Sequence, residues 1–120
     1  MTPVLGSVPT PLLVGLGGAT GALCRHAVDG ALNGGRPSTF AVNALGSLAL
    51  GVLIADSPAE PALALAGIGF CGAFTTFSSF AVNVASAATS GRYAVAAADA
   101  AGTFVAALLG VGLGWVIAGV

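Results

Sequence analysis

The length of the uncharged segments limits most strongly what this chain can fold into. Among 120 residues only three arginines and four acidic residues carry charge, and lysine is absent. Soluble domains carry about a quarter charged residues, whereas this chain carries 6% and is 57% hydrophobic. We therefore expect an all-α membrane protein, because in lipid a helix satisfies every backbone polar group internally. The charged residues are Arg25, Asp29, Arg36, Asp56, Glu60, Arg92 and Asp99.

Charges and prolines divide the chain into four apolar segments. They cover about residues 11–27, 39–55, 62–90 and 93–119. Since roughly 20 helical residues cross a bilayer, the pattern predicts a single domain of four transmembrane helices in the cell membrane. The third segment is longer than one straight crossing and contains GFCGAFTTFSSF at 69–80. We expect a break near 72–76, where freed backbone groups line a cavity or bind a ligand.

The position of the charges predicts an orientation. Arg25, Arg36 and Arg92 fall in or beside the loops after the first and third segments, and only Asp56 and Glu60 lie between the second and third. The positive-inside rule then places the arginine ends in the cytoplasm and both termini outside. Four such segments form a thin bundle, so a pathway across the membrane would need more than one subunit.

Several polar residues lie inside the apolar segments. Thr39, Asn43 and Ser47 recur every four residues and share one helical face. Asn43 must bond another helix or a permeating species, and both interpretations stay open. Asp99 would lie ~9 Å inside the last segment, where an acidic residue is a functional candidate, although an aqueous vestibule would equally explain it. Thr103 follows one turn later.

The phenylalanines of the third segment alternate with hydroxyl residues. Phe70, Phe74, Phe77 and Phe80 would form one stripe on a continuous helix. Lipid contact explains such a stripe but not the threonines and serines between its rings. Ring edges carry positive partial charge, and hydroxyl donors can replace the water shell of an ion. Together they suit a small anion that must enter and leave quickly.

Other functional classes are disfavoured. With few ionisable side chains to cluster, we expect no enzyme, and a net charge of −1 leaves no basic surface for nucleic acid. Cys24 and Cys71 form no C-x-x-C pattern, so we interpret both as small buried hydrophobic residues.

Three segments, in order, resemble the CrcB/Fluc family of fluoride channels. They are GGATGALCRH (17–26), TFAVNALGS (39–47) and GFCGAFTTFSSF (69–80), and the resemblance covers nearly the whole chain. It implies a fluoride-selective channel subunit that mediates passive fluoride export to relieve fluoride toxicity. It also implies an antiparallel, dual-topology dimer with a structural sodium ion at its centre.

The resemblance also implies roles for single residues. Phe77 and Phe80 would line the fluoride path, and the backbone carbonyls of Gly72 and Thr75 from both subunits would hold the sodium ion. Arg25 would be structural or lie at a vestibule. The complete predicted fluoride pathway is Phe77, Phe80, Asn43, Thr39, Thr76, Ser79 and Thr103.

The chain departs from the family pattern at Asn83, where glutamate is frequent, at Asp99, where an uncharged polar residue is commoner, and at His26, which replaces a frequent aromatic. The one-sided arginines favour a heterodimer with a related, oppositely inserted chain, and a homodimer is the alternative. Two other functions stay open. One is a small proton-coupled multidrug-type exporter that uses Asp99, and the other is a non-transporting membrane assembly subunit.

Overall fold

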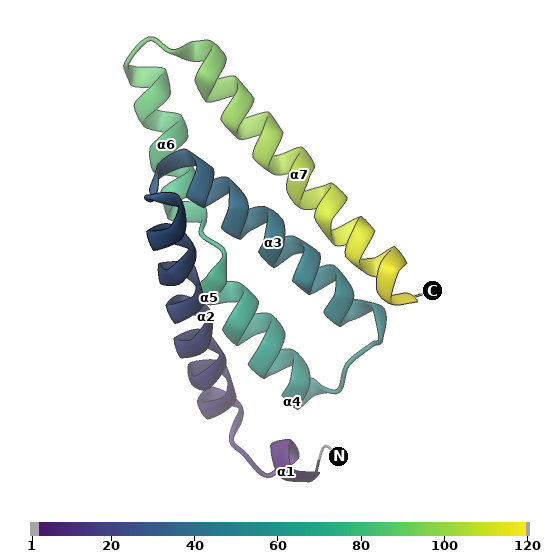
Figure 1. The fold of residues 1–120 in the computed structure, drawn as a ribbon. Helices are drawn as coiled ribbons and strands as arrows, with labels where there is room; N and C mark the ends of the chain where they lie inside the picture. Colours follow the sequence, from purple (N-terminus) through teal and green to yellow (C-terminus); the bar gives the residue numbers. More distant parts are fainter. Residues whose placement is uncertain (1–2, 120) are drawn as a thin grey trace.

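The computed structural model describes residues 3–119, and all the regular structure within them is helical (Figure 1). The molecule is elongated, with extents of 54 × 30 × 22 Å. Helix α3 lies between α7 and the broken third segment, while α2 packs on the far side of that segment. The elements are α1 (Pro3–Gly6), α2 (Thr10–Leu32), α3 (Gly35–Ala55), α4 (Glu60–Ala62), the π-helix η1 (Leu63–Cys71), α5 (Gly72–Phe74), α6 (Phe77–Thr89) and α7 (Tyr93–Gly119).

Three helical stretches of the described chain are long and apolar enough to cross a membrane. They are Gly35–Ala55, Glu60–Thr89 and Tyr93–Gly119. Helix α2 has 23 residues, about 35 Å of helix, but its second half carries Arg25, His26 and Asp29. The all-α fold is thus confirmed with three candidate spans, whereas a crossing by α2 stays a prediction.

Helix α7 has a largely exposed apolar surface that suits contact with lipid. Only Ala96 and Gly114 are buried among its residues, and large apolar side chains such as Leu113 are exposed. Tyr93 and Trp115 are exposed near its two ends. Their 22-residue separation corresponds to ~33 Å of helix, close to the hydrocarbon thickness of a bilayer. Aromatic residues are enriched at both membrane interfaces, so α7 fits one full crossing.

Small residues allow the helix backbones to approach closely. A Cβ atom on Gly51 of α3 would collide with the backbone of Val111 on α7, and one on Gly114 of α7 would collide with the backbone of Leu48. Gly17 and Gly21 of α2 lie equally close to the backbone of η1. Glycine is therefore required at these contacts, which hold the bundle together by close van der Waals packing.

The third helical segment is interrupted at residues 75–76. Thr75 and Thr76 adopt extended conformations, with ψ of 166° and 121°, between the end of α5 and the start of α6. The wide π-helical turns of η1 come directly before, and such turns are frequent at functional sites. The break therefore divides the apolar segment into two helices that run at different angles (Figure 1).

The expected break divides the phenylalanines, and the burial of one cysteine differs from the expectation. The four phenylalanines do not form one stripe, because the break divides them into a stacked pair, Phe70 and Phe74, with ring centroids 5.7 Å apart, and a second pair on α6. Cys71 is buried as expected, but Cys24 is exposed on the outer face of α2. Its exposure follows from the packing of α2, which turns Gly17 and Gly21 inward instead.

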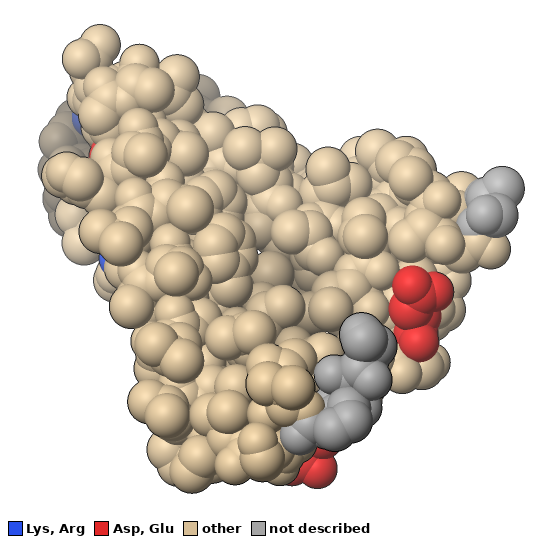
Figure 2. All heavy atoms as spheres, turned by 60° about the horizontal axis from the view of Figure 1, so that its bottom comes forward, with Lys and Arg blue, Asp and Glu red and all other residues tan. Residues whose placement is uncertain are grey.

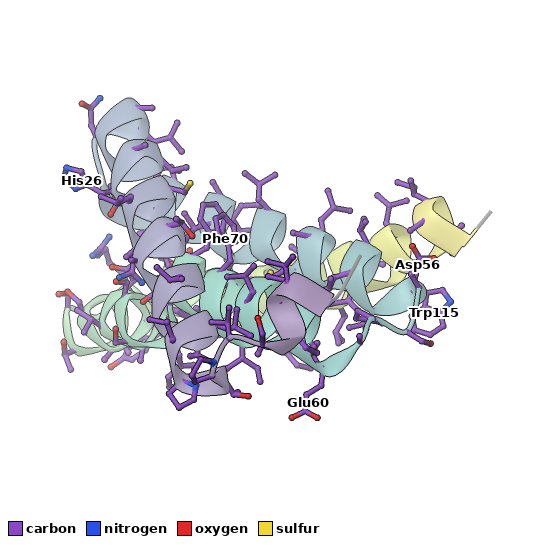
Figure 3. The ribbon with its side chains drawn as sticks, turned by 90° about the horizontal axis from the view of Figure 1, so that it is seen from below. His26, Asp56, Glu60, Phe70 and Trp115 are labelled. Carbon is purple, nitrogen blue, oxygen red and sulfur yellow. The ribbon has the colours of Figure 1, made fainter. Side chains whose placement is uncertain are left out.

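The arginines lie at one end of the molecule, whereas acidic residues occur at both ends. Figure 2 shows exposed acidic side chains at one end of a largely uncharged surface, and arginine atoms, with a little acidic surface beside them, only at the opposite edge. In Figure 3, His26 lies at one end, and Asp56, Glu60 and Trp115 lie at the other. The arginine end contains both the α2–α3 and the α6–α7 connections, as an ion pair between α3 and α7 shows.

Candidate functional site

The break opens onto a cavity of about 450 Å³ between α3, the broken segment and α7. Seven residues of the predicted fluoride pathway or sodium site line it. Five come from the segment around the break, Asn43 comes from α3 and Thr103 comes from α7. Its lining is Asn43, Gly46, Ser47, Leu50, Gly67, Cys71, Gly72, Thr75, Thr76, Phe77, Phe80, Thr103, Phe104 and Ala107.

Asn43 stabilises the break by bonding the backbone of Thr76. Its Nδ2 donates to the Thr76 carbonyl at 3.0 Å, and the Thr76 N–H donates to its Oδ1 at 2.8 Å. In a continuous helix the Thr76 N–H would instead donate to the Gly72 carbonyl. One side chain of α3 thus replaces the helical partners that the interruption removes. The second N–H of Nδ2 is not used by the Thr76 carbonyl, and Asn43 lines the cavity.

The residues of the break also bond to their neighbours. The Thr76 Oγ1 accepts the Ser79 N–H at 3.2 Å and caps the start of α6. On the other side, the Thr75 N–H and Oγ1 both donate to the Cys71 carbonyl, at 3.0 and 2.9 Å. The two extended residues are therefore held in a defined conformation.

Phe77 and Phe80 project from the first turn of α6. Their ring centroids are 5.8 Å apart with planes tilted by 49°, and both line the cavity. Phe77 is 78% exposed, so the cavity is open on the side where this ring stands. An aromatic ring this exposed lacks the contacts that a packed ring makes.

Two predicted pathway residues lie in a second, more polar cavity of about 310 Å³ at the arginine end. Thr39 and Ser79 line it, and the Nδ2 of Asn83 donates to the Thr39 Oγ1 at 3.3 Å. Thr39 lies one turn before Asn43 on α3. The predicted pathway is therefore divided between two cavities, and residues from the first turns of α6 line both of them. The second cavity is lined by Asp29, Gly34, Gly35, Thr39, Ser78, Ser79, Val82 and Asn83.

Arg25 lines neither cavity. From α2 its Nη1 donates to the Thr75 carbonyl at 3.1 Å, so it ties α2 to the break. A cation beside a free carbonyl stabilises the interruption, because charged donors form the stronger hydrogen bonds. Arg25 thus has a structural contact, and it shares the Thr75 carbonyl with the predicted sodium site.

The structure forms two polar contacts that were not predicted from the sequence. Asp99 lines neither cavity and forms a bidentate pair with Arg36 instead. Asn83, which departs from the family pattern, donates a hydrogen bond to Thr39. The Arg36–Asp99 contact could have been predicted from the sequence, because the two opposite charges lie near the same membrane end of two predicted helices. The second depends on tertiary packing and had no signal in the sequence.

Comparison with known proteins places this arrangement in a family. The profile of the CrcB-like protein family, described as Camphor Resistance (CrcB), matches residues 12–115. The chain is 48% identical over 107 residues to the fluoride-specific ion channel FluC 2 of Haloarcula marismortui, which covers 86% of this chain and 88% of the relative. It is 51% identical to FluC 2 of Natronomonas pharaonis, over 88% and 90% of the two chains.

A third relative, the fluoride-specific ion channel FluC 1 of Halobacterium salinarum, is 38% identical over 91% of this chain and 93% of its own. The similarity extends over nearly the full length of each of these relatives, and the residues matched by the family profile include the lining of both cavities. With its apolar helices, the chain is a multi-pass membrane protein. It belongs to the CrcB-like protein family.

Proposed function

We propose that this chain is the subunit of a fluoride-selective channel that lets fluoride leave the cell passively across the plasma membrane. The observation that carries the proposal is the constellation at the break. Asn43 is fixed against the Thr76 peptide beside the Phe77 and Phe80 rings, in a chain 48% and 51% identical to two proteins named fluoride-specific ion channels. A channel breaks no covalent bond, so no enzymatic role is assigned.

The chemistry of the first cavity suits a small anion. Phenyl ring edges carry positive partial charge, and the amide of Asn43 and the hydroxyl of Thr103 supply neutral donors. Its lining contains no charged side chain. Neutral donors replace part of the hydration shell without trapping the ion, as rapid conduction requires.

The two cavities define the proposed route. An ion would pass Phe77, Phe80 and Thr103 in the first cavity and then the hydroxyls of Ser79 and Thr39 in the second. The turn from Asn43 to Thr39 on α3 connects the two. Thr76 lies between the two linings, since it lines the first cavity and its Oγ1 contacts Ser78 and Ser79 of the second.

We propose further that the channel is a dimer of antiparallel subunits, each with four membrane crossings, α2 included. The cavity is open beside the exposed Phe77, and a second subunit would close it. The arginines gather at one end of the chain, which favours a single orientation in the membrane. The partner would then be a related chain inserted the opposite way, and a homodimer is the alternative.

A structural sodium ion at the dimer centre completes the proposal. The Gly72 carbonyl has lost its helical partner, because the Thr76 N–H bonds Asn43. The Thr75 carbonyl accepts Arg25 and keeps a second lone pair. Carbonyl oxygens suit a hard cation. The residues 3–119 contain no group of three His, Cys, Asp or Glu side chains that could hold a metal, so the backbone would supply the ligands.

The two alternatives make different predictions. A proton-coupled exporter needs an acid that gains and loses a proton, whereas the Asp99 carboxylate is bound at both oxygens by Arg36. An assembly subunit would give no ion flux. Fluoride and chloride efflux from liposomes that contain the purified protein, alone or with a related chain inserted the opposite way, tests the channel. Transport that depends on a proton gradient and is lost in Asp99→Asn would indicate the exporter.

A further inference from the structure

An ion pair joins the arginine-end turns of α3 and α7. Arg36 Nε donates to Asp99 Oδ2 at 2.6 Å, and its second guanidinium nitrogen, Nη2, donates to Oδ1 at 2.7 Å. It is the one salt bridge within residues 3–119. The side chain of Arg36 is 47% exposed and that of Asp99 is 18% exposed, so the pair stands at an accessible rim rather than in the core.

The pair lies on the same helix faces as the proposed pathway. Asp99 is one turn from Thr103 on α7, toward the arginine end, and Thr103 lines the first cavity. Arg36 precedes Thr39 by three residues and Asn43 by seven on α3, which places all three on one face. The pair therefore lies on the arginine-end side of Thr39 on α3 and of Thr103 on α7.

The charges in the pair cancel. A lone guanidinium one to two turns from the pathway would attract anions, and a lone carboxylate would repel them. At such separations a unit charge changes the local anion concentration by roughly 2- to 10-fold at low ionic strength. Salt would screen the effect, because an exposed rim lies within reach of counterions.

We propose that Asp99 is a charge-compensating residue at the arginine-end mouth of the pathway, which cancels the attraction of Arg36 for anions and so sets the anion occupancy of that mouth. The inference rests on the proposed channel function. Helices α3 and α7 already approach closely through backbone contacts at Gly51 and Gly114, and the Arg36 side chain is 47% exposed. The pair therefore acts through its charge rather than by stabilising the packing of α3 against α7.

The test is fluoride efflux from liposomes at low fluoride, low ionic strength and mildly alkaline pH. We expect Asp99→Asn to increase the efflux rate by roughly 2- to 10-fold and Arg36→Gln to decrease it. Both differences should shrink when an impermeant salt is added. The double variant, in which neither charge remains, should return close to the wild-type rate.

If the pair instead stabilised the contact between α3 and α7, both single variants and the double variant would show slow fluoride efflux. Added salt would not restore the efflux rate. That pattern, or an unchanged rate in Asp99→Asn, would overturn the proposal. Asp56→Asn is the matched control, since it removes one carboxylate at the opposite end of the molecule (Figure 3) and should leave the rate unchanged. If Asp99→Asn does not fold, Asp99→Ser makes the same charge change with a smaller side chain.

Absence of fluoride efflux from the wild-type chain, both alone and together with a related chain inserted the opposite way, would reject the channel function itself. The charge proposal fails separately. It is rejected when the wild type conducts fluoride but the efflux rates of the Asp99 and Arg36 variants do not change as expected.

Discussion

The amide of Asn43 and the peptide of Thr76 form a two-point contact across the bundle, with donor–acceptor distances of 3.0 and 2.8 Å. One side chain on α3 thereby satisfies both the N–H and the carbonyl of a residue that has left the helix. The contact explains how an irregular backbone persists at membrane depth, where unpaired polar groups are costly. It also fixes where Phe77 begins α6.

Asn43→Ala is predicted to destabilise the break and to abolish conduction. Both polar groups of Thr76 would lose their partner, at a cost of roughly 1–3 kcal/mol in unfolding free energy. Thermal unfolding in detergent and fluoride efflux measure the two effects. Thr89→Ala is the matched control, because the Thr89 hydroxyl bonds only carbonyls of its own helix. Equal stability of the two variants would contradict the role of Asn43.

Neighbouring glycines of α7 should respond differently to a methyl group. A Cβ on Gly114 would collide with the backbone of Leu48 and lie 2.8 Å from the Val52 nitrogen, whereas nothing lies within 4 Å of one on Gly112. Gly114→Ala should cost roughly 1–3 kcal/mol of unfolding free energy, because α3 and α7 must separate. Gly112→Ala should be neutral or slightly stabilising, since alanine favours helix. A similar unfolding temperature for both variants would argue against the close α3–α7 approach.

Replacing Phe80 tests whether the rings act on the ion or only fill space. Phe80→Ile keeps an apolar side chain but removes the ring edge, and we expect fluoride efflux to fall about 10-fold or more, equivalent to ~1.4 kcal/mol. Phe40→Ile is the matched control, because Phe40 is 46% exposed on α3 and lines neither cavity. Unchanged efflux in folded Phe80→Ile would mean that the rings serve packing alone.

Much of the fold follows from the sequence because membrane helices are defined by local composition. The helical class, the division at charged loops and the interruption near Gly72 all depend on apolar length and on glycine and hydroxyl content. The partners of individual side chains depend on how helices rotate against each other, which composition does not specify. The bond between Asn83 and Thr39, the Arg36–Asp99 pair and the exposure of Cys24 are of this kind.

The division of the pathway into two cavities has the same origin. Thr39 and Ser79 come from the same sequence motifs as Asn43 and Phe80. Thr39 lies one turn nearer the arginine end than Asn43 on α3, and the change of direction at Thr75 and Thr76 brings Ser79 to the same cavity as Thr39. Residue type predicted the kind of site, whereas the backbone angle at the break decided which residues meet.

Sodium should stabilise the assembled protein specifically. If the Gly72 and Thr75 carbonyls hold the ion, its binding to the folded state alone raises stability by about 2.7 kcal/mol at a concentration 100 times the dissociation constant. The unfolding temperature in detergent should rise with sodium chloride but not with an organic-cation chloride of equal ionic strength. Equal effects of the two salts would reject a sodium site at the break.

Fluoride efflux from liposomes that contain this chain tests the channel function most directly. An external fluoride electrode records the efflux, and parallel liposomes loaded with chloride measure selectivity. Because the one-sided arginines favour a partner chain, the assay is run with the chain alone and with a related chain of opposite charge arrangement. We expect rapid fluoride efflux with little chloride efflux in at least one of the two preparations. No fluoride efflux from either preparation, or equal efflux of the two anions, would contradict it.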